Sequence, residues 1–251
     1  MIRRFNRFEL KYIIPAAVRD ALLPDLLQHM SPDSHGAGGS YRVTSLYYDS
    51  QDLACYRAKI EGIKFRRKVR VRIYGDYEAD PAALVMLEIK QRINRTVQKR
   101  RVDMPLSAAL GLLAGHGHET FLRPEDETVA AEVEYLARTL GLQPTCVITY
   151  LRQAYVGSRY ESGLRVTFDG NLAVRGPEFG LGPGLPEHFF LPPDWMIMEI
   201  KVNETVPLWV SRMIARHECT LRRISKYCRG LALLRGLERG DVLGGELWKT
   251  S

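Results

Sequence analysis

The stretch of residues 64–75 alternates basic and apolar side chains, and this alternation limits the folds that the chain can adopt. Lys68, Arg70 and Arg72 fall on one side of an extended backbone, while two valines and an isoleucine fall on the other. A repeat of two residues is typical of a β-strand, because successive side chains of a strand point to opposite faces. Taken alone, the stretch fits a strand with one face in the core and its basic face in water.

Four further stretches, at residues 7–12, 86–92, 164–169 and 197–203, repeat this alternation of a charged face with an apolar face. The charged faces carry both signs together: Glu9, Lys11, Glu88, Lys90, Arg92, Arg165, Asp169, Glu199 and Lys201. If helices cover the apolar faces, the charged faces meet one another across a closed sheet. The sequence therefore predicts an α+β fold in which a closed β-barrel encloses a water-filled tunnel that binds polyanions.

The charge balance of the whole chain also favours an anionic partner. The 251 residues include 36 Lys and Arg against 29 Asp and Glu, which gives a formal net charge of +7. This excess does not distinguish nucleic acid, acidic lipid and phosphate compounds. The four cysteines form no C-x-x-C pair, and no apolar run is long enough to span a bilayer. We therefore expect one domain over residues 1–251, a cytoplasmic location and no membrane segment.

Periodicity and turn residues place the elements along the chain. The expected strands lie at residues 4–14, 41–49, 64–75, 84–92, 96–102, 146–156, 164–168 and 195–202. The expected helices lie at residues 15–27, 53–60, 105–115, 125–140, 207–217 and 221–237. The segment 176–193 is dense in Gly and Pro, so we expect a long surface loop there.

Short motifs occur in a fixed order along the chain: Glu9-Leu10-Lys11, Tyr48-Asp49, Arg70-Val71-Arg72, Glu88-Ile89-Lys90, Lys99 with Arg101, Arg152, Arg165, Glu199-Ile200-Lys201 and Ser225-Lys226-Tyr227. Each motif alone is common in strands, but the ordered set is specific. Together they resemble the VTC domain, the catalytic part of the vacuolar transporter chaperone polyphosphate polymerase, which is one of the triphosphate tunnel metalloenzymes. The resemblance spans nearly the whole chain.

The resemblance implies an antiparallel barrel of about eight strands, whose tunnel holds the triphosphate of ATP and a divalent metal, Mn²⁺ or Mg²⁺. It also implies that the terminal phosphate of ATP is transferred to a growing polyphosphate chain. The catalytic phosphate contacts that it implies are Lys11, Arg70, Arg72, Lys90, Arg152, Arg165 and Lys226. The implied substrate contacts are Lys99, Arg101, Lys201 and Tyr48. Glu199 matches the metal ligand, and Glu88 and Glu9 are further candidate ligands.

The chemistry of phosphoryl transfer asks for these residue types independently of the resemblance. Catalysis of this reaction consists mainly of positioning and of neutralising charge on the phosphate oxygens. Arginine grips two oxygens at once, and lysine supplies a mobile point charge. Mg²⁺ and Mn²⁺ prefer oxygen ligands, so one or two carboxylates suffice beside the substrate phosphates.

Plainer interpretations stay open for several of these residues. Glu199 with Lys201 could form a structural cross-strand ion pair, and Glu9 and Glu88 could serve as partners for nearby basic residues. Lys226, in an expected helix, would by default lie in water.

Other functions also fit parts of the sequence. The resemblance also covers hydrolytic tunnel enzymes, which have an E-x-E-x-K motif on the first strand. In this chain Arg7 occupies the first acidic position of that motif, which favours the polymerase branch. A triphosphate hydrolase and a non-catalytic module that binds polyphosphate remain alternatives. The basic runs 64–72 and 92–101 could contact RNA, although a tunnel of this kind is too narrow for a duplex. We expect ATP and polyphosphate as partners, and no nucleic acid.

Overall fold

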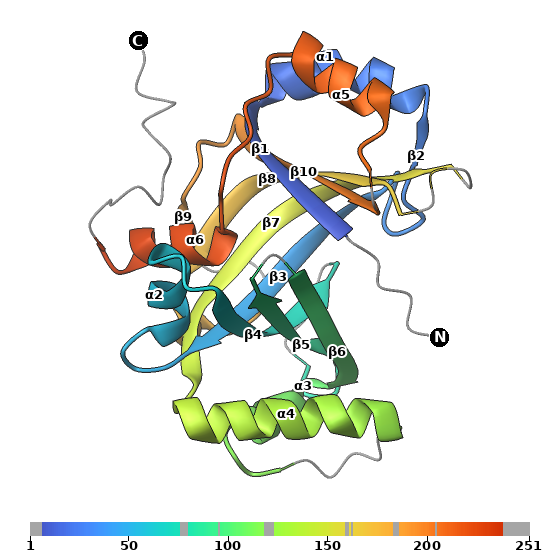
Figure 1. Cartoon of the computed structure of the whole chain (residues 1–251). Helices are drawn as coiled ribbons and strands as arrows, with labels where there is room; N and C mark the ends of the chain where they lie inside the picture. The colour runs from blue at the N-terminus through green and yellow to red at the C-terminus, as the bar shows by residue number, and fades with distance from the viewer. Residues whose placement is uncertain are drawn as a thin grey trace.

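The fold is one large antiparallel sheet with helices packed against it, as the computed structural model shows (Figure 1). The structure describes residues 7–75, 80–94, 96–117, 123–158, 161, 163–182, 186–203 and 205–237. Eight strands form a continuous path in the order β1 (Arg7–Pro15), β10 (Trp195–Asn203), β8 (Arg165–Arg175), β7 (Gln143–Gly157), β3 (Ser40–Asp49), β4 (Phe65–Tyr74), β5 (Leu84–Ile93) and β6 (Thr96–Pro105). Two short strands lie off this path: β2 (Met30–Pro32) pairs with β7, and β9 (His188–Phe189) pairs with β8.

The sheet curls but does not close, so the prediction of a closed barrel is wrong. The strand path of the described residues begins at β1 and ends at β6, and these two strands are not paired with each other. The edge strand β6 carries Lys99, Arg100 and Arg101 in succession, with Lys99 and Arg101 exposed. Charged side chains of this kind are typical of edge strands that stay unpaired.

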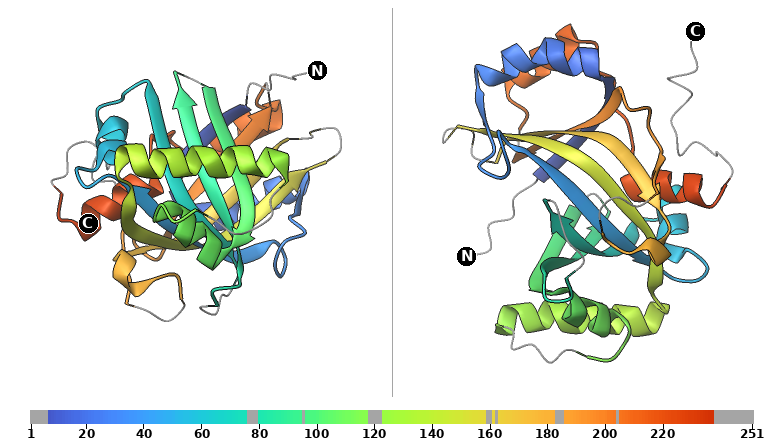
Figure 2. Two further views of the ribbon diagram at one scale, coloured as in Figure 1. Left: turned by 90° about the horizontal axis from the view of Figure 1, so that it is seen from below. Right: turned by 180° about the vertical axis from the view of Figure 1, so that it is seen from behind.

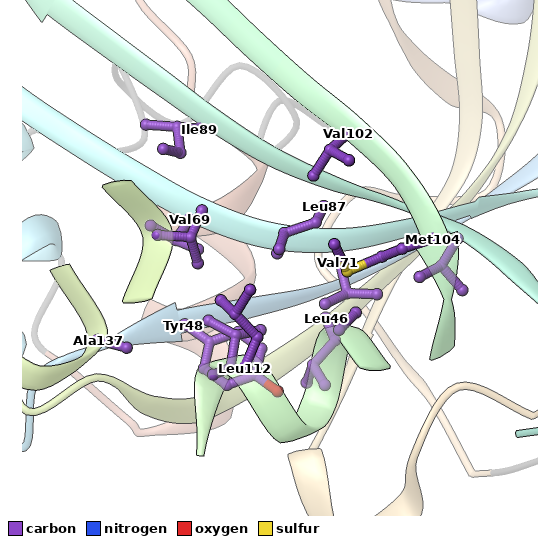
Figure 3. Close-up of a cluster of buried hydrophobic side chains, with 14 of the residues drawn as sticks. Leu46, Tyr48, Val69, Val71, Leu87, Ile89, Val102, Met104, Leu112 and Ala137 are labelled. Atoms are coloured by element: carbon purple, nitrogen blue, oxygen red, sulfur yellow. The ribbon is translucent and has the colours of Figure 1, made fainter. Parts of the chain in front are cut away.

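Two pairs of helices cover the convex face of the sheet, one pair at each end of the strand path (Figures 1 and 2). The first pair, α1 (Ala16–Leu27) and α5 (Leu208–Arg216), packs on the apolar sides of β1, β10 and β8. The second pair, α3 (Leu106–Leu113) and α4 (Pro124–Leu140), packs on β4, β5 and β6. Figure 3 shows this second core, in which Val71 and Leu87 of the strands belong to the same buried cluster as Leu112 of α3. The apolar faces predicted from the alternation are thus buried as expected.

The two remaining α-helices of the described residues, α6 (Lys226–Leu234) and α2 (Ala54–Ile60), pack on the concave face of the sheet. Tyr227 and Leu231 of α6 are buried among apolar side chains that β3, β7 and β8 direct inward. Gly230 allows this close approach, because a Cβ atom there would lie 2.4 Å from Cδ1 of Ile148. One part of the concave face is therefore filled by an apolar core, and the polar part lies beside it.

Several boundaries differ from the predictions. The last helix begins at Lys226 rather than 221, because Leu221 bridges to β1 and Ser225 caps the helix by accepting a hydrogen bond from the backbone N–H of Cys228. β8 extends to Arg175, and the predicted loop 176–193 contains a 3-10 helix, η2 (Pro177–Phe179), as well as β9. Residues 4–6 of the first predicted strand lie outside the described residues. The single-domain assignment stays a prediction.

Among the described residues, no helix has both the length and the apolar character that crossing a bilayer requires.

Candidate functional site

Charged side chains from both ends of the strand path meet on the polar part of the concave face. Strand pairing sets Lys11 opposite Glu199 and Arg70 opposite Glu88, so their side chains share one face. We define the charged cluster as ten basic residues with four acidic ones: Lys11, Arg70, Arg72, Lys90, Lys99, Arg101, Arg152, Arg165, Lys201, Lys226, Glu9, Glu88, Asp169 and Glu199. Because the basic residues outnumber the acidic ones, the cluster keeps a net positive charge that suits a polyanion.

Glu199 is the most heavily paired carboxylate of the cluster. Its oxygens lie 2.7 Å from Nζ of Lys226, 3.0 Å from Nζ of Lys11 and 3.3 Å from Nζ of Lys201. A fourth cation, Nη2 of Arg152, lies 3.8 Å away. Burial alone would raise the pKa of Glu199, but the surrounding positive charges hold it well below its usual range. Glu199 is therefore ionised at neutral pH.

Asp169 forms a second buried carboxylate site beside Glu199, although no sequence motif singles it out. Its oxygens accept two hydrogen bonds of 2.7 Å from Nε and Nη2 of Arg152, and one oxygen lies 2.5 Å from Nζ of Lys226. Burial raises the pKa of Asp169, and these two cations outweigh that effect and lower it. The alternation on residues 164–169 placed Asp169 on the same face as Arg165, which was the available signal.

Glu88 organises the other half of the cluster, on β4, β5 and β6. It is 1% exposed, and it pairs with Nε of Arg70 at 2.6 Å and with Nζ of Lys99, while Nε of Arg72 lies 4.0 Å away. Burial opposes ionisation, but these three cations lower the pKa of Glu88 to about 2. The hydroxyl of Tyr47 accepts a further hydrogen bond of 2.8 Å from Nη1 of Arg70, which fixes the guanidinium in place.

Glu9 connects the two ends of the strand path. One oxygen of this β1 residue lies 3.2 Å from Nζ of Lys90 on β5, and the other lies 3.7 Å from Nζ of Lys201 and 3.9 Å from Nζ of Lys11. Burial would raise the pKa of Glu9, but these lysines lower it to about 2. Partial loss of hydration, together with the neighbouring charges of Lys11 and Lys201, lowers the pKa of Lys90 to about 8. The open side of the sheet is therefore spanned by an ion pair between side chains.

Arg165 lies at the margin of the cluster and is held by residues near β2 and β3. Its Nη2 atom lies 2.6 Å from a carboxylate oxygen of Asp33 and donates a hydrogen bond of 3.0 Å to the hydroxyl of Tyr41. Asp33 is buried, and the exposed ring of His35 contacts its other oxygen at 2.9 Å. Arg165 is thus oriented before any ligand arrives.

Two predicted substrate contacts lie differently from the others. The structure contradicts the placement of Tyr48 in the cluster, because its side chain points to the convex face and packs in the core with Val69 (Figure 3). The preceding residue, Tyr47, is the one that faces the cluster. Arg101 shares the face of Glu88 and is exposed, and its Nη1 atom lies 3.9 Å from the sulfur of Met86.

The three candidate metal ligands do not converge on one point. Glu88 has basic partners of its own, whereas Glu9 and Glu199 share Lys11 and Lys201. The described residues contain no group of three His, Cys, Asp or Glu that could hold a metal. Glu199 and Asp169 come together, with Lys226 between them. Carboxylates of this number suit a metal that arrives with phosphate ligands of its own, since Mg²⁺ is commonly bound by one or two carboxylates plus substrate phosphates. Such an ion would have to displace the ammonium group of Lys226, which lies 2.5 Å from Asp169 and 2.7 Å from Glu199.

Comparison with known proteins identifies the family. The family model described as VTC domain matches residues 6–235 of the chain. The chain belongs to the VTC domain family. This confirms the resemblance found in the sequence motifs.

Curated relatives support the VTC domain assignment. Vacuolar transporter chaperone complex subunit 4 of Schizosaccharomyces pombe is 21% identical over 257 residues, covering 83% of this chain and 34% of the relative. The subunit 4 of Trypanosoma cruzi is 24% identical over 229 residues, covering 77% of this chain and 28% of the relative. The chain thus spans about a third of the length of the curated relatives it matches.

Solved structures of similar shape are more distant. A candidate adenylate cyclase from Bacillus halodurans is 11% identical, with a TM-score of 0.49 over 86% of this chain and 92% of that one. A candidate adenylyl cyclase from Hippeastrum with a dominant triphosphatase activity is 14% identical, with a TM-score of 0.46 over 91% of this chain and 95% of that one.

Proposed function

We propose that this VTC domain is a metal-dependent polyphosphate polymerase, which transfers the terminal phosphate of ATP to a growing polyphosphate chain on the concave face of the sheet. The observation that carries the proposal is the charged cluster, in which ten basic side chains surround four carboxylates. The family membership supports the same reaction, because the motifs that define the resemblance supply most of these side chains.

The basic residues of the cluster bind and orient the phosphates. Arg70, Arg72 and Arg152 are each held by hydrogen bonds that are buried or partly buried, so their guanidinium groups are in place before the substrate arrives. Preorganised cations stabilise charge on phosphate oxygens without reorganising during the reaction. In the transfer step, a terminal oxygen of the polyphosphate chain forms a bond to the γ-phosphorus of ATP while the bond to the β,γ-bridging oxygen breaks and ADP leaves.

We assign Glu199 and Asp169 as the carboxylates that would hold the divalent metal. Such an ion supplies neutralisation of the charge on the transferred phosphate. The charges of Lys11 and Lys226 position the phosphates around the same point. Glu9 and Glu88 are proposed here as counter-ions that hold basic residues in place, Glu9 through Lys90 and Glu88 through Arg70.

The experiment is incubation of the purified protein with ATP and Mn²⁺, followed by gel separation of phosphate polymers and measurement of free phosphate. We expect a ladder of polymer that Glu199→Gln abolishes. Glu125→Gln is a matched control, because that carboxylate is 68% exposed on α4. Unchanged ATP with no polymer, from protein that still binds polyphosphate, would mean that the domain is a silent binding module.

A triphosphate hydrolase is the second candidate, and the pairing of Asp169 with Glu199 is the observation that favours it. Two adjacent carboxylates can hold a metal that activates water in place of a phosphate chain. Hydrolysis would release free phosphate from ATP or tripolyphosphate without forming polymer. The same assay therefore separates the two enzymes. A cytoplasmic location and the lack of a nucleic acid partner remain predictions.

A further inference from the structure

Basic side chains continue along the concave face beyond the charged cluster. They extend toward the edge of the sheet where β4 begins, β5 ends and β6 begins. In the strand register Lys68 stands opposite Lys90, Lys90 stands opposite Lys99, and in the next row Arg66 stands opposite Arg92. We define the basic track as these five residues: Arg66, Lys68, Lys90, Arg92 and Lys99. Lys90 and Lys99 also belong to the charged cluster, so the residues that extend it are Arg66, Lys68 and Arg92. The track begins two residues from Arg70 on β4, so it is continuous with the cluster.

Direct opposition of like charges is unfavourable in an antiparallel sheet, because the Cβ atoms of such pairs lie only about 5 Å apart. In the basic track this electrostatic repulsion is only partly offset by acidic partners. Among the described residues, Lys90 and Lys99 have carboxylate partners, in Glu9 and Glu88, but Arg66 and Arg92 have none. Burial, with Arg92 as a neighbour, lowers the pKa of Arg66.

The hydrogen bonds of the outer row leave its charge unbalanced. Arg66 donates from Nη1 to the backbone oxygen of Ile63, and Arg92 donates from Nε to the backbone oxygen of Asn94. A backbone oxygen carries no full charge, so both guanidinium groups keep theirs. Each also retains N–H groups that could grip an anion.

The track is open to a ligand from solution. The side chains of Lys90 and Lys99 are 39% and 41% exposed, and Arg66 and Arg92 are partly exposed. Val97, in the same row as Arg92, is 41% exposed. The outer end of the track therefore faces solvent, whereas its inner end faces the cluster.

Helix α6 borders the track on its inner side. Nζ of Lys68 donates a hydrogen bond of 2.8 Å to Oγ of Ser225, the capping residue of α6, and lies 5.0 Å from the ring centroid of Tyr227. Behind this point the concave face is filled by the apolar packing of Tyr227 and Leu231. A chain of phosphates that leaves the cluster on this side meets a closed apolar region under α6 and an open basic surface along β4 and β5.

We propose that the basic track is a second binding site, which holds the part of a polyphosphate chain that extends beyond the charged cluster. Side chains on one face of a strand repeat about every 7 Å, so the successive rows give a long chain several further contacts that a short chain cannot reach. The identity of the ligand rests on the proposed function. The track itself rests on strand register, exposure and uncompensated charge.

The test compares a short and a long ligand on one double variant, Arg66→Ala with Arg92→Ala. We expect the affinity for long-chain polyphosphate to fall by about tenfold, and the affinity for tripolyphosphate to change by less than about twofold, because only the long chain reaches the outer row. The matched control is Arg138→Ala with Arg212→Ala, which removes the same charge from exposed positions on α4 and α5. This control should leave both affinities unchanged.

Equal losses of affinity for both ligands, or no loss of affinity for long-chain polyphosphate, would overturn the proposal that the basic track binds the long chain. A single-stranded oligonucleotide that binds the track more tightly than polyphosphate would overturn the identity of the ligand. Removing an opposed like-charged pair should not lower the thermal unfolding midpoint at low salt. The single variant Arg92→Gln repeats the comparison if the double variant does not fold.

The result is separable from the proposed function, because binding is measured without ATP. If no polymer forms in the ATP assay and the length-dependent loss is still seen, the polymerase fails and the track stands. If polymer forms and the double variant binds long chains like the wild type, the track fails and the polymerase stands.

Discussion

Replacement of Asp169 by Asn tests the network that holds Arg152 and Lys226 in place. Asp169 is fully buried, accepts two hydrogen bonds from Arg152 and pairs with Lys226. The amide keeps the shape of the carboxylate but loses its charge, and it directs N–H groups toward donors. Removing one partner from a buried ion pair costs about 3–5 kcal/mol. Because Glu199 still pairs with both cations, we expect the free energy of unfolding to fall by about 3 kcal/mol, at the lower end of that range.

The same reasoning predicts how the Asp169→Asn variant responds to phosphate. A bound polyanion supplies negative charge to Arg152 and Lys226, so it replaces part of what the substitution removes. Tripolyphosphate should therefore raise the denaturant midpoint of the variant more than that of the wild type. Urea unfolding curves with and without tripolyphosphate at pH 7 measure both effects.

The control for this prediction is Asp20→Asn, since Asp20 is 62% exposed and pairs with Arg19 at the surface. An exposed ion pair contributes about 0–1 kcal/mol, so this variant should unfold almost as the wild type does. A loss of less than about 1 kcal/mol for Asp169→Asn would refute the buried network. Equal stabilisation of wild type and variant by tripolyphosphate would refute the idea that the polyanion replaces the negative charge of Asp169.

Three further predictions concern acid stability, ligand binding and packing. The pKa of Glu88 is about 2 in the folded chain against an ordinary 4.5. Its ionisation therefore contributes about 3 kcal/mol to the free energy of unfolding above pH 4.5, and this contribution is lost as the pH falls toward 2. Glu88→Gln should flatten acid unfolding curves between these two pH values. The pKa of Lys90 is about 8, so the affinity for tripolyphosphate should decline as the pH rises through 8, and titration calorimetry should find that Lys90→Arg removes this decline. Gly230→Ala should lower the free energy of unfolding by about 1–3 kcal/mol, measured by urea titration, because the new Cβ meets Ile148; an unchanged urea midpoint would show that α6 does not pack this closely.

The alternation in the sequence predicted which side chains share a face, because a strand fixes the direction of each residue relative to its neighbours. Arg70, Arg72 and Glu88 lie on the concave face for this reason. The pattern could not predict whether the sheet closes, since closure depends on pairing between β1 and β6. It also could not reveal the role of Asp169, which depends on the register that sets it opposite Arg152.

Residues assigned by the resemblance alone had mixed outcomes. Lys226 reaches the cluster because the extended segment before α6 pairs with β1 and Ser225 then starts the helix, and neither step is visible in helical periodicity. Tyr48 was placed in the cluster by its motif, although Tyr47 is the residue that contacts Arg70. Adjacent tyrosines on a strand point to opposite faces, and a motif without a register does not tell which of them points inward.

If polyphosphate is the ligand, as proposed above, the Glu9–Lys90 ion pair has a consequence for how a long chain reaches the concave face. A ladder of backbone hydrogen bonds would have sealed that flank, so that a linear ligand had to be threaded by its tip. Competing anions can instead break an ion pair between side chains, and the phosphates of the ligand are such anions. A chain already hundreds of units long could then be laid in sideways at an internal position, and its release would not have to wait for a free end.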